Sequence, residues 1–352
     1  MTPLVQHHDC LLLDLDGTVF RGSLPTEGAV DSLARADLRT LYVTNNASRS
    51  AADVATHLHE LGFAAAATDV ATSAQAAAHL LAQLLPPGSA VLVVGTQALA
   101  AEVSSAGLRP VRLSSEQPVA VVQGHSRQTG WSDLTEAALA LQSGALWVAT
   151  NTDRTLPTER GLVPGNGSMV AALCAATDRT PRIAGKPSPC LLENALRRGR
   201  FRAPLVVGDR LDTDIAGANA ASLPSLLVLS GVATAADVVA APPALRPTHL
   251  GHDLRTLHAD NTSSTISAHP AWRVSVEDAG GGARVTVEST GSRVAADDLA
   301  VVRATAAAVW DAGLTGGFSV HAGDDTAGAA LQPWGLLQLS RSAEVVPPAH
   351  VR

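Results

Sequence analysis

The chain has 352 residues, a length that allows two or three domains with a large buried core. Hydrophobic residues make up 46% of it and charged residues 16%, a globular composition that excludes an intrinsically disordered chain. The formal net charge is −7, and no basic stripe with interleaved aromatic residues is present. We therefore expect no nucleic-acid partner, and an anionic substrate would need a metal ion or a few local Lys and Arg side chains.

The cysteines and the N-terminus predict the compartment. Cys10, Cys174 and Cys190 have no metal-ligand spacing, and three scattered thiols are typical of reduced, buried cysteines in an intracellular protein. The segment from Met1 to Asp9 is short and polar, unlike a signal peptide, and the apolar runs are shorter than the roughly 18 residues of a membrane span. We expect a cytoplasmic protein without a membrane partner.

Predicted strands and helices alternate along most of the chain. The apolar run Cys10–Leu13 ends in Asp14-Leu15-Asp16-Gly17, which predicts a strand buried on both faces in a parallel sheet. The alternation restarts near Ala74 and resumes after Pro181, which indicates a self-contained α/β module inserted at 74–181. The further predicted strands are 40–43, 90–94, 118–122, 146–150, 204–207 and 225–229, and the predicted helices are 28–36, 50–61, 74–85, 99–106, 133–142, 188–198 and 213–221.

The C-terminal part has a different pattern. Residues 259–269 are rich in Ser, Thr and Asn and are predicted to be a linker. Trp272–Val276 and Ala283–Val287 alternate with period two around Gly280-Gly281-Gly282, which predicts a β-hairpin. A helix is predicted at Ala296–Ala312. We therefore expect a small α+β domain at 270–352.

Carboxylates follow two of the predicted strands. Asp14 and Asp16 lie at the carboxyl end of the first strand, the edge at which open α/β sheets bind ligands. Asp209 and Asp214 follow the strand 204–207. Each Asp alone could equally be a turn or helix-cap residue. Four carboxylates at the tips of two parallel strands would repel one another unless a cation lay between them, and oxygen-only ligands suit Mg²⁺.

Two other strand tips offer groups for phosphate. Thr44 and Asn45 present a hydroxyl, an amide and backbone N–H groups just before a helix, a natural anion seat. Lys186 lies between Gly185 and Pro187, and the proline favours an extended conformation at the lysine. A lysine is usually a solvated surface group, but its place in a turn that opens a helix favours a functional role.

Taken together, the segments DLDGT, TNN, GKP and GDRLDTD strongly resemble the motifs of the haloacid dehalogenase superfamily, in the same order, over residues 9 to 258. The resemblance implies a doubly wound, Rossmannoid parallel-sheet core at 1–73 and 182–258. The insert at 74–181 looks like a C2-type α/β cap, as in NagD-like and 4-nitrophenylphosphatase-like phosphatases. Local matches to that subfamily are Ala149–Asp153, Pro164–Gly167, Gly185–Pro189 and Leu229–Val232.

The resemblance also implies roles for single residues. Asp14 would be the nucleophile that forms an aspartyl-phosphate, and Asp16 would protonate the leaving alkoxide and then activate water. Lys186 would neutralise charge on the phosphoryl group and on Asp14. The presence of both acids indicates a phosphatase, because the superfamily's dehalogenases lack the second. The implied Mg²⁺ ligands are Asp14, Asp16 and Asp209, with Asp214 bound through water or behind them, and the implied substrate-binding residues are Thr44, Asn45, Asn46, Asn151 and Lys186.

The region 270–352 resembles a truncated acetyltransferase. It has no Arg/Gln-x-x-Gly-x-Gly/Ala loop for the pyrophosphate of acetyl-CoA, because Gly316-Gly317 and Gly323 lack that spacing. A phosphatase with such a tail is similar to the actinobacterial glycerol-3-phosphate phosphatases, which implies hydrolysis of glycerol 3-phosphate to glycerol and phosphate. Caps of this kind often form homodimers. The sequence leaves open pyridoxal 5′-phosphate, nucleotide or sugar phosphates as substrates, a non-catalytic phosphate-binding regulatory module, and an active acetyltransferase.

Overall fold

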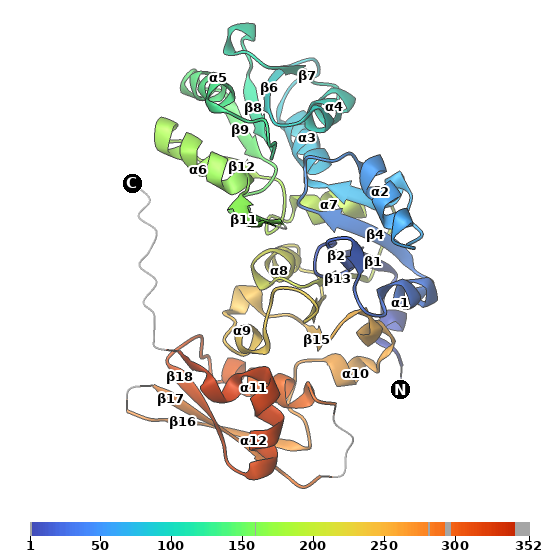
Figure 1. Ribbon diagram of the computed structural model, residues 1–352, viewed down its shortest axis with the longest axis vertical. Helices are drawn as coiled ribbons and strands as arrows, with labels where there is room; N and C mark the ends of the chain where they lie inside the picture. Colours follow the sequence, from blue (N-terminus) through green and yellow to red (C-terminus); the bar gives the residue numbers. More distant parts are fainter. Residues whose placement is uncertain (1, 159, 281, 293–296, 342–352) are drawn as a thin grey trace. The chain divides into compact units, whose positions relative to one another are not determined.

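The computed structural model describes residues 2–158, 160–280, 282–292 and 297–341 (Figure 1). Some predictions fall outside them: Gly281 in the predicted hairpin turn, Ala296 at the start of a predicted helix, and 342–352 of the predicted C-terminal domain. The chain divides into two compact units. The unit that contains the insert comprises Cys10–Leu15 and Leu38–Pro204 and is called the cap unit; the tail unit comprises Met1–Asp9, Asp16–Asp37 and Leu205–Arg352. The predicted domain boundaries stay predictions.

The cap unit contains two groups of parallel strands. In the first, β1 (Cys10–Leu13) pairs with β4 (Arg39–Thr44), and β4 pairs with β5 (Val70–Thr72). All four residues of β1 are fully buried, as expected for a strand covered on both faces. The helices beside this group are α2 (Ala51–Glu60) and α7 (Cys190–Leu196). A reciprocal capping box between Ser50 and Asp53 starts α2.

The second group is a five-stranded, all-parallel sheet in the order β12-β9-β8-β6-β7. Its helices lie on both sides of the sheet, α3 and α4 on one and α5 and α6 on the other (Figure 1). Trp147, Leu141 and Leu173 fill the core beneath α5 and α6. The bounds are β6 Ala90–Val94, β7 Arg109–Val111, β8 Ala120–Gln123, β9 Leu146–Ala149, β12 Arg182–Ile183, α3 Ser73–Leu84, α4 Gln97–Ser105, α5 Trp131–Gln142 and α6 Asn166–Thr177, with a separate hairpin of β10 Thr155–Thr158 and β11 Gly161–Pro164.

The tail unit also contains two groups of strands. Three are parallel: β13 (Pro204–Gly208), β14 (Ser225–Val228) and β15 (His249–Gly251). A mixed four-stranded sheet has the order β16-β17-β18-β19, and α11 and α12 pack on it (Figure 1). The remaining bounds are β2 Phe20–Arg21, β3 Leu24–Pro25, α1 Ala29–Ala36, α8 Ala216–Ala220, α9 Ala235–Val239, α10 Asn261–Ser264, β16 Trp272–Asp278, β17 Ala283–Ser289, α11 Ala300–Asp311, β18 Phe318–Ala322, α12 Asp325–Leu331 and β19 Ser340–Arg341.

One hydrophobic core joins β14 and β15 to the C-terminal sheet. Leu227 of β14 and Leu250 of β15 belong to the same buried cluster as Val302 and Val309 of α11 and Phe318 of β18. Polar contacts reinforce this core: the indole N–H of Trp310 donates to the Val238 carbonyl at 3.2 Å, and the Arg303 guanidinium donates to the Leu250 carbonyl at 3.2 Å. The acetyltransferase-like region is therefore built into the tail unit.

The observed elements agree with one prediction and differ from two others. The predicted hairpin is confirmed, with Val274 opposite Val287 in antiparallel register. The predicted linker 259–269 is partly ordered structure, because α10 forms within it and Ser264 is buried. The helix predicted at 213–221 is a π-helical turn, Leu211–Ile215, followed by the short α8.

The prediction that the cysteines are buried is confirmed for one of the three. Cys10 is buried, whereas Cys174 and Cys190 are partly exposed, and none of the three forms a disulfide within the described residues. Among the residues that the structure describes, none of the helices is both long enough and apolar enough to cross a bilayer.

Candidate functional site

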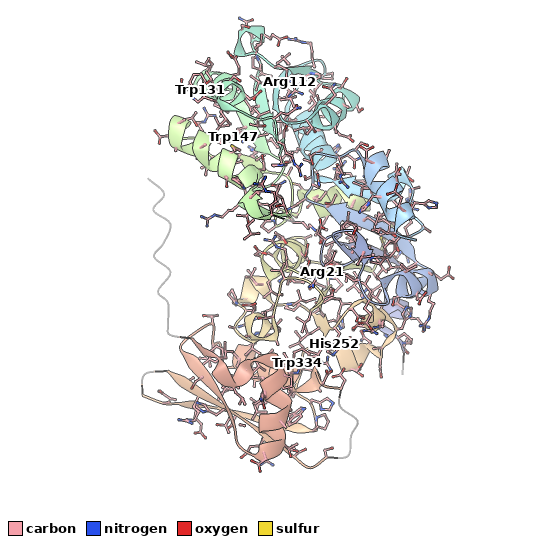
Figure 2. All side chains as sticks on the ribbon, in the orientation of Figure 1. Arg21, Arg112, Trp131, Trp147, His252 and Trp334 are labelled. Atoms are coloured by element: carbon pink, nitrogen blue, oxygen red, sulfur yellow. The ribbon has the colours of Figure 1, made fainter. Side chains whose placement is uncertain are left out.

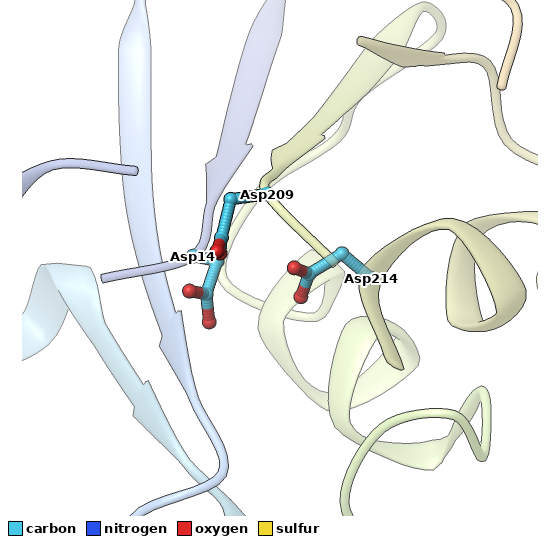
Figure 3. Close-up of side chains that lie close together, drawn as sticks. All are labelled: Asp14, Asp209 and Asp214. Atoms are coloured by element: carbon cyan, nitrogen blue, oxygen red, sulfur yellow. The ribbon is translucent and has the colours of Figure 1, made fainter. Parts of the chain in front are cut away.

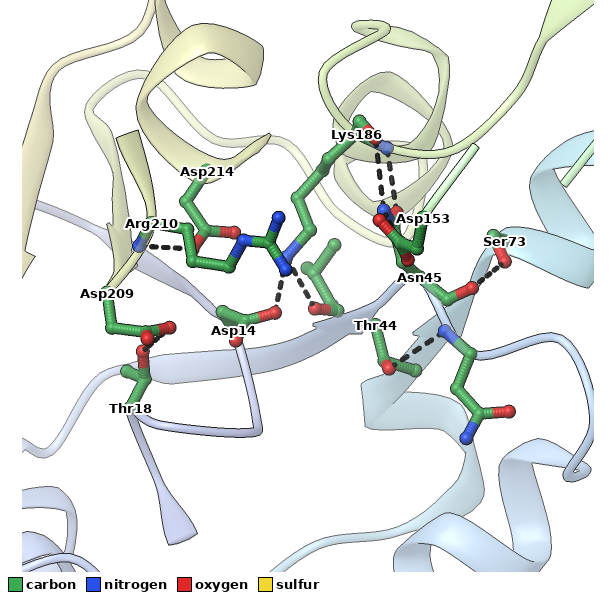
Figure 4. A network of polar contacts seen from close by, with 12 residues as sticks. Asp14, Thr18, Thr44, Asn45, Ser73, Asp153, Lys186, Asp209, Arg210 and Asp214 are labelled. Atoms are coloured by element: carbon green, nitrogen blue, oxygen red, sulfur yellow. Dashed lines mark hydrogen bonds and ion pairs between the residues drawn. The ribbon is translucent and has the colours of Figure 1, made fainter. Parts of the chain in front are cut away.

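The cap unit places Lys186 against Asp14. Asp14 directly follows β1, and the Lys186 ammonium contacts its carboxylate at 2.5 Å and the Val43 carbonyl at 3.2 Å (Figure 4). The Lys186 side chain is only 3% exposed. An ammonium is costly to bury unless it is paired and hydrogen-bonded, so this contact both satisfies the lysine and favours the charged form of the carboxylate. Lys186 is the only lysine in the chain.

The predicted phosphate loop follows β4. The Thr44 hydroxyl accepts the Asn46 N–H at 3.1 Å, and the Asn46 side chain accepts both the N–H and the hydroxyl of Ser48 at 2.8 Å. The carboxamide of Asn45 contacts the peptide of Lys186 instead, with the Lys186 N–H at 2.8 Å and the Lys186 carbonyl at 3.0 Å. The structure thus brings this loop into contact with Lys186.

Asn151 joins the same group from the insert. It follows β9, is 4% exposed, and donates from its side chain to the Asn45 carbonyl at 2.7 Å. Asp153, two residues further on, lies 3.5 Å from the Asn45 side-chain nitrogen. Asp14, the 44–46 loop, Asn151 and Lys186 are therefore linked within one compact unit, and their roles as substrate ligands stay predictions.

The tail unit holds the second pair of predicted metal ligands (Figure 3). Asp209 follows β13 and Asp214 lies in the π-helical turn; they are 0% and 1% exposed, and their carboxylates offer oxygens within 4.8 Å of each other. Two buried carboxylates this close repel each other unless a cation lies between them. Two carboxylates with only oxygen donors fit Mg²⁺ by donor chemistry. Turns of the π type occur often at functional sites.

A backbone N–H and a hydroxyl donate to the Asp209 carboxylate. The Val232 N–H donates to its Oδ2 at 2.7 Å, and the Thr18 hydroxyl donates to its Oδ1 at 3.5 Å. Gly17 and Gly231 leave the space for this carboxylate, since a Cβ would come within 2.4 Å of Oδ2 at Gly17 and 1.8 Å at Gly231. Sequence reasoning did not identify Thr18 or Val232 in this role; the DLDGT and Leu-Ser-Gly-Val segments that contain them were the available signal.

Asp214 is buried, whereas Asp16 is exposed. The Arg210 N–H donates to the Asp214 carboxylate at 3.1 Å, and a Cβ at Gly208 would come within 2.3 Å of the Asp214 side chain. Asp16 is exposed and forms an isolated bridge with Phe20 at the start of the β2–β3 hairpin. An exposed carboxylate at a strand tip can exchange protons with water or with a bound ester, the behaviour expected of an acid–base residue.

Two family models cover the core segments, and a third covers the C-terminal region. Residues 11–109 match the haloacid dehalogenase-like hydrolase model, 183–257 match the HAD-hydrolase-like model, and 269–336 match the GCN5-related N-acetyltransferase-like domain. The chain belongs to the haloacid dehalogenase-like hydrolases. Its α/β fold with a Rossmannoid core confirms the predicted fold class.

The similarity extends to particular relatives. The chain is 59% identical over 346 residues to the D-glycerol 3-phosphate phosphatase of Mycobacterium tuberculosis, covering 96% of this chain and 97% of that protein. The crystal structure of a glycerol phosphate phosphatase from M. tuberculosis in complex with magnesium matches with a TM-score of 0.91 and 60% identity over 96% of this chain and 99% of that one. An acid sugar phosphatase of Staphylococcus aureus is 34% identical over 239 residues, covering 66% of this chain and 91% of that protein.

Proposed function

We propose that this chain is a Mg²⁺-dependent phosphatase that hydrolyses glycerol 3-phosphate to glycerol and phosphate. The observation that carries the proposal is the 59% identity to a D-glycerol 3-phosphate phosphatase, which extends over 96% of the chain and so includes the insert and the tail. The ion pair of Asp14 with the buried Lys186 and the buried Asp209–Asp214 pair support it. The cytoplasmic location and the homodimer stay predictions.

Chain connectivity supports a single site for these residues. Asp14 lies three residues before Gly17, whose α-carbon faces the Asp209 carboxylate. We therefore propose that Asp14 and Asp209 act on the same metal ion, as the resemblance of the motifs implies. In the proposed site Asp14, the Asp16 carbonyl and Asp209 hold the metal, and Asp214 supports it. Bound Mg²⁺ would supply positive charge to the phosphoryl oxygens.

The chain's own residues then perform the two steps. An Asp14 oxygen attacks phosphorus, the bond from phosphorus to the ester oxygen breaks, and the Asp16 carboxyl gives its proton to the departing alkoxide. Asp16, now ionised, takes a proton from water as the water oxygen attacks the aspartyl-phosphate, which releases inorganic phosphate and restores Asp14. Lys186 balances the charge on Asp14 and on the phosphoryl group in both steps.

Phosphate release by wild type and Asp14→Asn tests the proposal, with and without Mg²⁺. The panel contains glycerol 3-phosphate, pyridoxal 5′-phosphate, a nucleotide and a sugar phosphate, because the S. aureus relative is named a sugar phosphatase. We expect glycerol 3-phosphate to have the highest kcat/KM, a requirement for Mg²⁺, and no turnover by Asp14→Asn. Asp212→Asn is a matched control, since Asp212 lies in the same motif but pairs with Arg210 at an exposed position.

The alternative functions give different results in the same assay. A non-catalytic phosphate-binding module would bind phosphate without Mg²⁺-dependent turnover. An acetyltransferase would bind acetyl-CoA, which calorimetry on the full chain measures directly. A higher kcat/KM for any other ester of the panel would replace glycerol 3-phosphate as the substrate while leaving the phosphatase activity in place.

A further inference from the structure

The side chain of Asn45 forms hydrogen bonds with both the N–H and the carbonyl of Lys186. The Asn45 carboxamide accepts the Lys186 N–H through Oδ1 at 2.8 Å and donates from Nδ2 to the Lys186 carbonyl at 3.0 Å. Only one orientation of the carboxamide satisfies both bonds, because the flipped group would set donor against donor and acceptor against acceptor. Gly185 makes this approach possible, since a Cβ there would come within 2.5 Å of Asn45 Oδ1.

The series of amide contacts continues into the insert. Asn151 donates from its side chain to the Asn45 carbonyl at 2.7 Å, and Asn166 donates to the Asn151 carbonyl at 2.7 Å. Asn151 and Asn166 are 4% and 2% exposed, so an unmatched donor there would carry the full cost of desolvation. Asn166 is the first residue of α6. Three asparagines thus connect a helix of the insert to the backbone of Lys186.

The other end of this series is the ammonium that meets Asp14. Between the gripped peptide and the Nζ atom lies only the lysine side chain, and Nζ is itself fixed by Asp14 and the Val43 carbonyl. Moving the Lys186 peptide would therefore move or break the ion pair. The carboxamide of Asn45 makes contacts with Lys186 that a phosphoryl ligand would have to replace.

We propose that Asn45, Asn151 and Asn166 are positioning residues for Lys186, and that they tie its ammonium to the position of the insert. Asn45 acts on the reaction through its grip on the lysine and not through its side chain as a phosphate ligand. The kinetic part of this inference rests on the proposed phosphatase function, and the spectroscopic part below does not.

Isosteric variants test the proposal kinetically. Asn45→Asp keeps the acceptor for the Lys186 N–H but sets an oxygen against the Lys186 carbonyl, and Asn151→Asp does the same against the Asn45 carbonyl. A displacement of about 1 Å in a catalytic group can cost about 100-fold in rate, so we expect Asn45→Asp to lower kcat roughly 10- to 100-fold with KM within about threefold of wild type. Asn151→Asp is expected to lower kcat less, and the double variant to fall short of the product of the two single effects.

The matched control is Asn219→Asp. Asn219 is also partly buried and also donates from Nδ2 to backbone carbonyls, those of Ala244 and Arg246 at 2.8 and 3.2 Å. It belongs to the tail unit, whereas Lys186 belongs to the cap unit. Its variant measures the general cost of losing such donors. We expect it to keep wild-type kcat and KM and to show a melting temperature close to that of Asn45→Asp.

The single lysine gives a second readout that needs no turnover. Protein labelled with ¹³C at the lysine ε-carbon has one ε-methylene signal, because Lys186 is the only lysine. We expect this signal to shift in Asn45→Asp and, by less, in Asn151→Asp, and to coincide with wild type in Asn219→Asp. The spectra are recorded without substrate and with inorganic phosphate.

The outcomes separate the two hypotheses. A wild type that hydrolyses none of the esters refutes the proposed function, and the lysine signal then decides the positioning claim alone. An unshifted signal in Asn45→Asp overturns the positioning claim in every case. A normal kcat with a raised KM, together with weaker binding of inorganic phosphate, would instead make the Asn45 side chain a phosphate ligand and would also overturn it.

Discussion

The contact between Gly231 and Asp209 makes a sharp prediction for Gly231→Ala. The added Cβ would lie 1.8 Å from Asp209 Oδ2 and 2.2 Å from its Cγ. Non-bonded heavy atoms pack at about 3.5 Å, so the loop and the carboxylate must separate by more than about 1.5 Å. This separation would lengthen or break the hydrogen bond from the Val232 N–H to Asp209 Oδ2, which is 2.7 Å long in the wild type.

The size of the effect follows from that bond. A hydrogen bond to a charged group contributes about 1.5–3 kcal/mol, and about 1.4 kcal/mol corresponds to a factor of ten in binding. Loss of a group that orients a metal ligand typically weakens metal binding about 10- to 100-fold. We therefore expect Gly231→Ala to raise the Mg²⁺ concentration needed for half-maximal activity by about 10- to 100-fold.

Two measurements and one control check this prediction. Calorimetric titration of Mg²⁺ into the substrate-free protein gives the affinity directly, and phosphate release against Mg²⁺ concentration gives the half-saturation point. Gly328→Ala is the control, because Gly328 lies in α12 and its Cβ would meet Ala322 of β18 at an ordinary contact distance of 3.7 Å. Mg²⁺ affinity should therefore stay at the wild-type value. A Gly231→Ala protein with Mg²⁺ affinity within twofold of wild type would refute the placement of Asp209 as a metal ligand held by this loop.

Three further predictions concern stability and the metal site. Truncation after residue 258 should abolish a cooperative unfolding transition of the tail unit in calorimetry, because it removes α11 and β18 from the core that also contains Leu227 and Leu250; a truncated protein with wild-type melting temperature would contradict this. Burial, with a smaller effect from His8 and His7, lowers the pKa of His249 to about 4. The unfolded chain then binds a proton between about pH 6.5 and 4 that the folded chain does not, so stability should be complete above pH 6.5 and fall by up to about 3 kcal/mol toward pH 4. Urea unfolding at pH 7 and pH 5 should show a smaller loss in His249→Gln than in wild type. Asp214→Asn should weaken Mg²⁺ binding about tenfold while Asp212→Asn does not, and calorimetric titration compares the two.

The strand tips were predictable because their signals are local. Each of two runs of four apolar residues ends in a carboxylate, Asp14 directly and Asp209 after one glycine. Within six positions the sequence therefore indicates both a buried strand and a polar group at its end. The β16–β17 hairpin has the same kind of local signal, a period of two on either side of glycines. Strands of three residues, such as β5 and β15, are too short for any period to appear, and neither was predicted.

The contacts that shape the site were beyond sequence reasoning for a different reason. Asn45 and Lys186 are 141 residues apart, so the TNN and GKP motifs indicate two phosphate handles but not that one grips the other. The Val232 N–H is a backbone donor, and the residue type of Val232 does not indicate the direction of its N–H. Helix propensity does not predict the π-helical turn at Leu211–Ile215, in which Asp214 lies close to Gly208.

Two side chains mark where the C-terminal region meets the loop after β15 in the tail unit. His252 lies beside Trp334, with ring centroids 5.4 Å apart, and also contacts Asp298 at 2.7 Å (Figure 2). His252, together with Arg21 and Arg255, also lines a cavity of about 660 Å³ in this unit. The wall of that cavity therefore depends in part on residues of the acetyltransferase-like region.

The common core of β14, β15 and α11 has a consequence for relatives without such a tail. The S. aureus relative aligns with 66% of this chain, and its alignment already covers 91% of its own length. Any hydrolase of this family that ends before α11 must protect the surface around Val238, Leu227 and Leu250 in another way, by polar substitutions or by a different covering segment. Joining this tail to a shorter relative would therefore require apolar residues at those positions first, and the tail and its supporting surface would have to be transferred as one piece.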